Sequence, residues 1–217
     1  MPYVSPEYGR GMAERDWWLR TLLVLQRPRA VFAALHSDDE SDLEAREEPI
    51  LALIFLAGIA GVLSTDLASR ILDDFAIDGV ALAVWAFVAG GIYGVAAYFA
   101  LGFLLYAGAR AAGSSLSYRR ARHVLAFACV PLAFSLIAWP VRLAVYGEDT
   151  FRTGGSDTGA GAHVFEAIEY VALAWCAGLL VLGLRTVEGW SWGRALLASL
   201  PALVVPALAL ARAYGLV

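Results

Sequence analysis

The stretch from Gly79 to Ala109, GVALAVWAFVAGGIYGVAAYFALGFLLYAGA, contains no charged side chain and is followed by Arg110. A helix needs about 20 consecutive apolar residues to cross a bilayer whose hydrocarbon core is about 30 Å thick. The stretch is longer than this, so it predicts a transmembrane helix with enough length to tilt or to protrude. A soluble core helix is excluded, because such a helix carries polar residues on its solvent face.

Small residues recur within this stretch at spacings of four, four and three residues. They are Ala86, Gly90, Gly94 and Ala97. Residues three or four apart share one helix face, and small side chains on that face let another helix approach the backbone closely. We predict that this helix-packing stripe makes the helix the centre of a bundle, with self-association or assembly with other membrane proteins as a possible use. The alternative is that small residues are simply common in membrane helices.

The composition is that of an integral membrane protein. Of the 217 residues, 60 % are hydrophobic and 17 % are charged, whereas about 25 % are charged in soluble domains. The net charge of −4 argues against nucleic acid as a partner, because phosphate binding requires a concentrated positive surface. The two cysteines, Cys129 and Cys176, fall within predicted spans, so we expect no disulfide, no metal site and no cofactor.

Hydropathy divides the chain into three parts. Residues 1–36 are predicted to form a cytoplasmic amphipathic segment, residues 37–48 an acidic linker, and residues 49–217 a membrane domain. The five predicted spans cover about 49–65, 79–109, 123–146, 163–184 and 195–211. The predicted fold is therefore an all-α, five-transmembrane-helix bundle embedded in the lipid bilayer.

The N-terminal segment mixes aromatic and aliphatic side chains, among them Trp18, with several arginines. This mixture suits a helix that lies in the headgroup region of the membrane. Residues 29–36 are predicted to form a second short helix with Val31, Phe32 and Leu35 on one face, and contact with a soluble partner is the competing use of that face. The acidic linker is predicted to be solvated, as runs of like charge usually are.

The distribution of arginines predicts the orientation. Twelve arginines fall in the N-terminal segment and in the joints on the same side of the membrane, and four fall on the opposite side. The positive-inside rule therefore places the N-terminus in the cytoplasm and the C-terminus on the exterior or lumenal side. The acidic linker does not change this assignment, because carboxylates weigh little in that rule.

The uncharged part of the fourth predicted span is too short to cross the hydrocarbon core of a bilayer. Between Glu169 and Arg185 lie only 15 uncharged residues, or about 22 Å of helix, so Glu169 and Glu166 must enter the outer leaflet. Arg142 on the third span lies at a similar depth, and charges inside a bilayer usually pair within the bundle. We therefore predict an ion pair between Arg142 and Glu166 or Glu169.

His163, Glu166 and Glu169 recur every three residues and share one helix face. A proton or ion path and a metal site are thus alternatives to a structural ion pair. We predict no metal, because no second span offers a matching set of ligands. Catalytic sites are not expected either, since the sequence contains neither a zinc-protease motif nor a nucleophile elbow.

Three stretches add a family likeness to the pattern of five spans. They are Arg27-Pro28-Arg29-Ala30-Val31-Phe32, the run from Tyr118-Arg119-Arg120-Ala121-Arg122-His123 through Phe127 to Pro131, and Gly183-Leu184-Arg185. On the basis of these stretches, the chain resembles the Yip domain family of Ypt-interacting proteins, particularly its prokaryotic members. The resemblance extends from about Trp17 to the C-terminus. The resemblance implies a five-span membrane protein without enzymatic activity. Among eukaryotic relatives it implies Golgi and endoplasmic-reticulum membranes and Rab-type GTPase partners.

The hallmark of those eukaryotic relatives, an acidic residue and leucine followed by glycine-proline, is missing here. Val130-Pro131 stands at that place, which argues against a GTPase partner. Together with the composition, this departure favours a prokaryotic plasma-membrane protein. We expect a non-enzymatic role in membrane organisation, in a trafficking-like process or in partner binding. The alternative is a small transporter or channel subunit with a path lined by Arg142, Glu166 and Glu169.

Overall fold

A computed structural model of the chain describes residues 18–38, 40–45, 47–63, 79–147 and 159–213. Within these ranges the chain forms helices and no strand, so the predicted all-α class is confirmed. Residues 1–17 of the predicted N-terminal segment and the last two residues of the first predicted span lie outside the described ranges.

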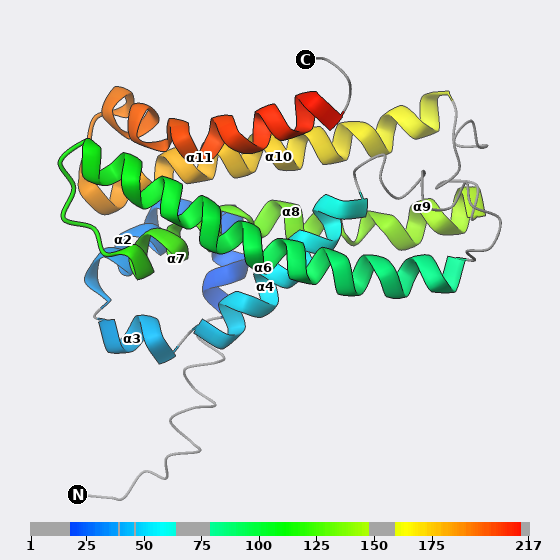
Figure 1. Ribbon diagram of the computed structural model, residues 1–217, viewed down its shortest axis with the longest axis horizontal. Helices are drawn as coiled ribbons and strands as arrows, with labels where there is room; N and C mark the ends of the chain where they lie inside the picture. Colours follow the sequence, from blue (N-terminus) through cyan, green and yellow to red (C-terminus); the bar gives the residue numbers. More distant parts are fainter. Residues whose placement is uncertain (1–17, 39, 46, 64–78, 148–158, 214–217) are drawn as a thin grey trace, which may run out of the picture.

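The described chain forms nine labelled helices. They are α2 (Pro28–Ser37), α3 (Glu40–Ala45), α4 (Glu47–Leu63), α6 (Gly79–Ala111), α7 (Tyr118–Ala128), α8 (Val130–Ser135), α9 (Ala138–Tyr146), α10 (Ala160–Glu188) and α11 (Trp192–Ala213). Residues 18–26 are helical as well. In Figure 1 the long helices α6, α10 and α11 run along the longest axis, and α2, α3 and α7 lie at one end of it.

Three stretches of the described chain are long and apolar enough to cross a membrane. They are Ala83–Ala111, Tyr118–Tyr146 and Ala160–Glu188. Only 33 % of the most apolar window is buried inside the protein in the first and in the third of these stretches. So much outward-facing apolar surface requires a lipid environment or a partner, because soluble monomers rarely expose large apolar patches.

α4 and α6 cross at glycines. A Cβ added at Gly58 would lie 2.5 Å from Gly94 Cα, and one added at Gly94 would lie 2.6 Å from Ile54 O. A Cβ added at Gly90 would lie 2.7 Å from Ile59 Cα. The two backbones therefore touch, and the pairing of residues 54 with 94 and 58 with 90 makes the helices antiparallel.

The predicted packing stripe lies largely on this interface. Ala86, Gly90 and Gly94 are buried, whereas Ala97 is only partly buried. Tyr98, which is 1 % exposed, continues the buried face in place of Ala97. The glycines of the stripe are covered by α4 of the same chain, so their close approach serves the internal packing of the bundle.

α11 covers another part of α6. A Cβ at Gly108 of α6 would collide with Ala198 O of α11. Nearer the end of α6, Arg194 Nε donates to Ala112 O at 3.1 Å. These pairs again join antiparallel helices. α10 packs against α2, α7, α8 and α11. Because α7 and α11 contact both α6 and α10, they connect these two long helices.

The third predicted span is three helices instead of one. The chain turns at Cys129, just before Pro131, and again at residues 136–137, before Pro140. Proline lacks an N–H and collides with the carbonyl four residues earlier, so breaks are expected at these places. Leu136 O accepts a bond from Trp139 N at 3.2 Å.

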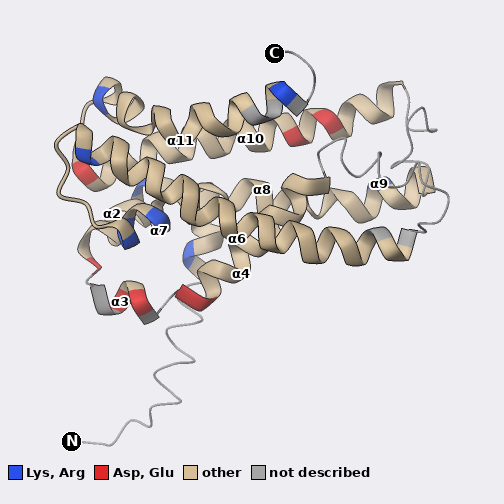
Figure 2. Cartoon of the chain, viewed as in Figure 1, with Lys and Arg blue, Asp and Glu red and all other residues tan. Residues whose placement is uncertain are grey.

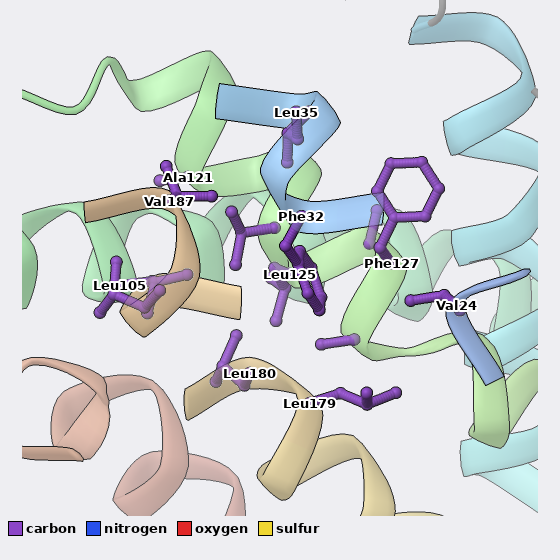
Figure 3. Packing of buried hydrophobic residues seen from close by; sticks show 14 of the residues in the cluster. Val24, Phe32, Leu35, Leu105, Ala121, Leu125, Phe127, Leu179, Leu180 and Val187 are labelled. Carbon is purple, nitrogen blue, oxygen red and sulfur yellow. The ribbon is translucent and has the colours of Figure 1, made fainter. Parts of the chain in front are cut away.

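α2 buries its apolar face in the bundle. Val31, Phe32 and Leu35 are at most 4 % exposed, and a Cβ at Gly183 of α10 would lie 2.8 Å from the Phe32 ring. Figure 3 shows Phe32 among side chains of α7 and α10. The expectation that this face meets headgroups or a soluble partner is therefore wrong, because α10 offers it a complementary glycine.

The α4–α6 crossing generates a matched test on one helix. Gly58→Ala should lower the thermal stability of the purified protein in detergent, because overpacking costs about 1–3 kcal/mol. Gly61→Ala is the control, since a Cβ there meets nothing within 4 Å and alanine is favoured over glycine in helices by about 0.5–1 kcal/mol. Equal melting temperatures for the two variants would contradict the observed crossing.

Candidate functional site

The N-terminus of α7 carries the largest described group of ion pairs. Ser117 caps the helix, and its hydroxyl accepts a bond from Arg120 N at 3.2 Å. The cap lets α7 begin abruptly after α6, so the arginines at 119, 120 and 122 project from its first turns. In Figure 2 blue and red segments meet at this end, around α3 and α7.

Arg122 is the most deeply buried of these arginines. Its Nη2 lies 2.8 Å from Glu47 Oε1, and the side chains are 8 % and 28 % exposed. The guanidinium carbon lies 5.3, 4.7 and 5.0 Å from the ring centroids of Tyr98, Phe99 and Tyr118. Three aromatic rings and one carboxylate therefore compensate a charge that has left water.

Two further arginines bind the acidic segment. Arg120 Nη2 donates to Asp38 O at 2.7 Å, and the Asp38 carboxylate forms a 2.9 Å ion pair with Arg20. Arg119 lies 3.6 Å from Glu44 and 4.0 Å from Glu47. We call this group the arginine clamp: Arg119, Arg120 and Arg122 with Asp38, Glu44 and Glu47.

The acidic linker is thus packed on α7 in part: Asp38 and Leu43 are buried, whereas Asp42, Glu44 and Glu48 are exposed, as a solvated linker predicts. Leu43 is fully buried and Asp38 is 8 % exposed. The ring of His123 lies between two carbonyls, with Nδ1 2.9 Å from Arg119 O and Nε2 3.1 Å from Leu43 O. A buried leucine at the centre of the acidic run and complementary charges on α7 hold one side of this segment against the bundle.

At the opposite end of the bundle, Arg142 of α9 lies beside Glu169 of α10. Arg142 Nη1 is 3.4 Å from Glu169 Oε1, and the two side chains are 13 % and 16 % exposed. The Trp139 ring centroid lies 4.9 Å from the guanidinium carbon. This arrangement suits a partly buried structural ion pair.

His163 and Glu166 lie outside that pair. His163 Nδ1 is 3.1 Å from Glu166 Oε2, and the side chains are 75 % and 51 % exposed. The structure thus brings Arg142 to Glu169 and His163 to Glu166. Within the described ranges no group of three or more histidine, cysteine or acidic side chains is placed to hold a metal ion.

Sequence reasoning did not identify the arginine clamp. The available signal was charge complementarity between the acidic run at 37–48 and the basic run at 119–123. Each run was interpreted alone, and nothing in either states that segments about 80 residues apart meet. The pattern of small residues likewise does not indicate that the Tyr98 ring lies beside Arg122.

The clamp generates a test with neighbouring glutamates. Glu47→Gln should destabilise the protein by about 2 kcal/mol, less than the 3–5 kcal/mol for a fully buried pair, since Glu47 is partly exposed. In this variant the guanidinium of Arg122 would stay buried without a carboxylate. Its Nε and Nη1 atoms have no hydrogen-bond partner within the described residues. Glu48→Gln is the control, because Glu48 is exposed. Thermal unfolding in detergent measures both, and an unchanged midpoint for Glu47→Gln would refute a stabilising role.

Comparison with known proteins places the chain in a family. Neither the curated proteins nor the solved structures include a match. The Yip1 domain family, in contrast, matches residues 22–213. The matched region runs from the helix of residues 18–26 to the end of α11, and it contains both the arginine clamp and the Arg142–Glu169 pair. The chain therefore belongs to the Yip1 domain family.

Proposed function

We propose that the chain is a non-enzymatic, multi-pass membrane protein that organises membranes or binds partners in a trafficking-related process. The family match over residues 22–213 carries this proposal. It agrees with a bundle whose long helices turn much of their apolar surface outward. The Arg122–Glu47 and Arg142–Glu169 ion pairs join different helices, which suits a protein that works by its shape and surfaces.

We further propose five spans: α4, α6, the unit of α7 to α9, α10 and α11. The antiparallel contacts of α6 with α4, α7 and α11 support an up-and-down arrangement. α4 has 17 residues, about 25 Å of helix, and a span this short is accommodated by local bilayer thinning. We propose a cytoplasmic N-terminus and an exterior or lumenal C-terminus, because the arginines concentrate on the N-terminal side. We propose a prokaryotic plasma membrane because of the composition and the missing eukaryotic hallmark.

Assembly with other membrane proteins or with a second copy remains part of the proposal. Gly90 and Gly94 already pack against α4, so such an assembly would use another face of the bundle. A GTPase partner is not proposed, since the eukaryotic hallmark before Pro131 is replaced by Val130.

A transport path is the competing function, and the geometry favours it less. A path needs polar groups that can exchange partners along a line through the bundle. Glu169 is instead held by Arg142 at 16 % exposure, while Glu166 and His163 bind each other on the exposed side of α10. Both carboxylates thus have local structural partners.

Proton flux separates the two functions. The full-length protein, reconstituted into liposomes with a pH gradient, should leak protons no faster than protein-free liposomes. Glu166→Gln combined with Glu169→Gln should leave this rate unchanged, because neither carboxylate carries protons. Glu48→Gln serves as a control for removal of a carboxylate outside the apolar belt. A wild-type leak that disappears only in the Glu166/Glu169 variant would overturn the proposal in favour of a transporter.

A further inference from the structure

The helix of residues 18–26 has apolar side chains on two faces. On one face Thr21 and Val24 are 1 % and 0 % exposed, and Val24 belongs to the buried core shown in Figure 3. The other face turns four large apolar side chains outward: Trp18 at 51 %, Leu19 at 51 %, Leu22 at 49 % and Leu23 at 41 % exposure. In water this outer face would be unfavourable, so it requires an apolar partner.

Positive charge adjoins the outer apolar face. Residues 18–37 contain three arginines and no acidic residue. Arg20 is engaged with Asp38, but Arg27 and Arg29 are exposed and have no recorded ion pair within the described ranges. An apolar face beside unpaired cations is complementary to a surface that is apolar inside and anionic outside.

The same end of the bundle carries arginines stacked on tryptophans. The Arg185 guanidinium carbon lies 4.7 Å from the Trp192 ring centroid, and that of Arg194 lies 4.2 Å from the Trp190 ring centroid. Tryptophan and arginine concentrate at the level of lipid headgroups. The helix of residues 18–26 joins α2, whose Phe32 ring packs on Gly183 of α10, two residues before Arg185. We therefore place it at the leaflet that these arginines and tryptophans mark.

We propose that the outer face of residues 18–29 binds acidic phospholipids. The four apolar side chains enter the boundary between headgroups and acyl chains, and Arg27 and Arg29 bind the lipid phosphates. The occupant is lipid because the four side chains of this face are large, apolar and exposed, and because the charged residues within 18–37 are all arginines. The inference rests on the proposed membrane embedding and adds a lipid specificity to it.

Lipid-specific quenching tests the inference in the full-length protein. Leu22→Cys, in a Cys129→Ala/Cys176→Ala background, is labelled with a fluorophore and reconstituted in phosphatidylcholine with phosphatidylglycerol. Either lipid then carries a nitroxide quencher on its acyl chain, at equal mole fraction. Because each arginine near an anionic surface is worth about a fivefold preference, quenching should be stronger with labelled phosphatidylglycerol. Arg27→Gln with Arg29→Gln should abolish the difference.

Two controls make every outcome decisive. Arg110→Gln with Arg212→Gln removes the same charge from other exposed positions and should preserve the preference. A fluorophore at Ile92→Cys, on the 67 % exposed side of α6, reports whether the bundle itself is embedded. Equal quenching by both lipids at residue 22 would overturn the specificity, and no quenching there would overturn the docking. No quenching at residue 92 either would instead contradict the membrane embedding.

Discussion

The contact between Arg122 and Glu47 determines how the first three long elements are joined. Glu47 begins α4, Arg122 lies in the second turn of α7, and the rings of Tyr98 and Phe99 come from α6. A guanidinium removed from water is costly unless a carboxylate and aromatic faces surround it. The observed arrangement supplies both, with the N-termini of α4 and α7 at the same end and α6 antiparallel to each.

The packing of the other helices is explained by an apolar environment around the bundle. Charged residues concentrate at the clamp end and near the Arg142–Glu169 pair, and few lie on the helices between them (Figure 2). In hydrocarbon there is no hydrophobic force between helices, so association depends on close backbone contact and on polar pairs. The glycines at 58, 90 and 94 supply the first, and the ion pairs supply the second.

Local sequence was sufficient for features that depend on one segment. The length of the apolar stretch predicted α6 to within two residues, and the breaks in the third span lie next to Pro131 and Pro140. The match in depth between Arg142 and Glu169 could be anticipated from helix rise alone, and the two side chains lie 3.4 Å apart.

Features that depend on pairing of distant segments could not be predicted in this way. An acidic run is normally solvated, and the arginines of α7 and the burial of Leu43 attach one side of it to the bundle here. The apolar face of α2 is equally suited to a membrane surface, and the absence of a side chain at Gly183 decides that it packs on α10. A stripe of small residues predicts that another helix packs closely against it. It does not predict whether that helix belongs to the same chain.

Cysteine accessibility in intact cells tests the up-and-down arrangement most directly. In a Cys129→Ala/Cys176→Ala background, single cysteines at Ser115, between α6 and α7, and at Ser191, between α10 and α11, occupy exposed positions, as does one at Ala160 at the start of α10. The account predicts that a membrane-impermeant maleimide labels the cysteine at 160 in intact cells and those at 115 and 191 only after permeabilisation. Labelling of all three from one side would contradict the arrangement.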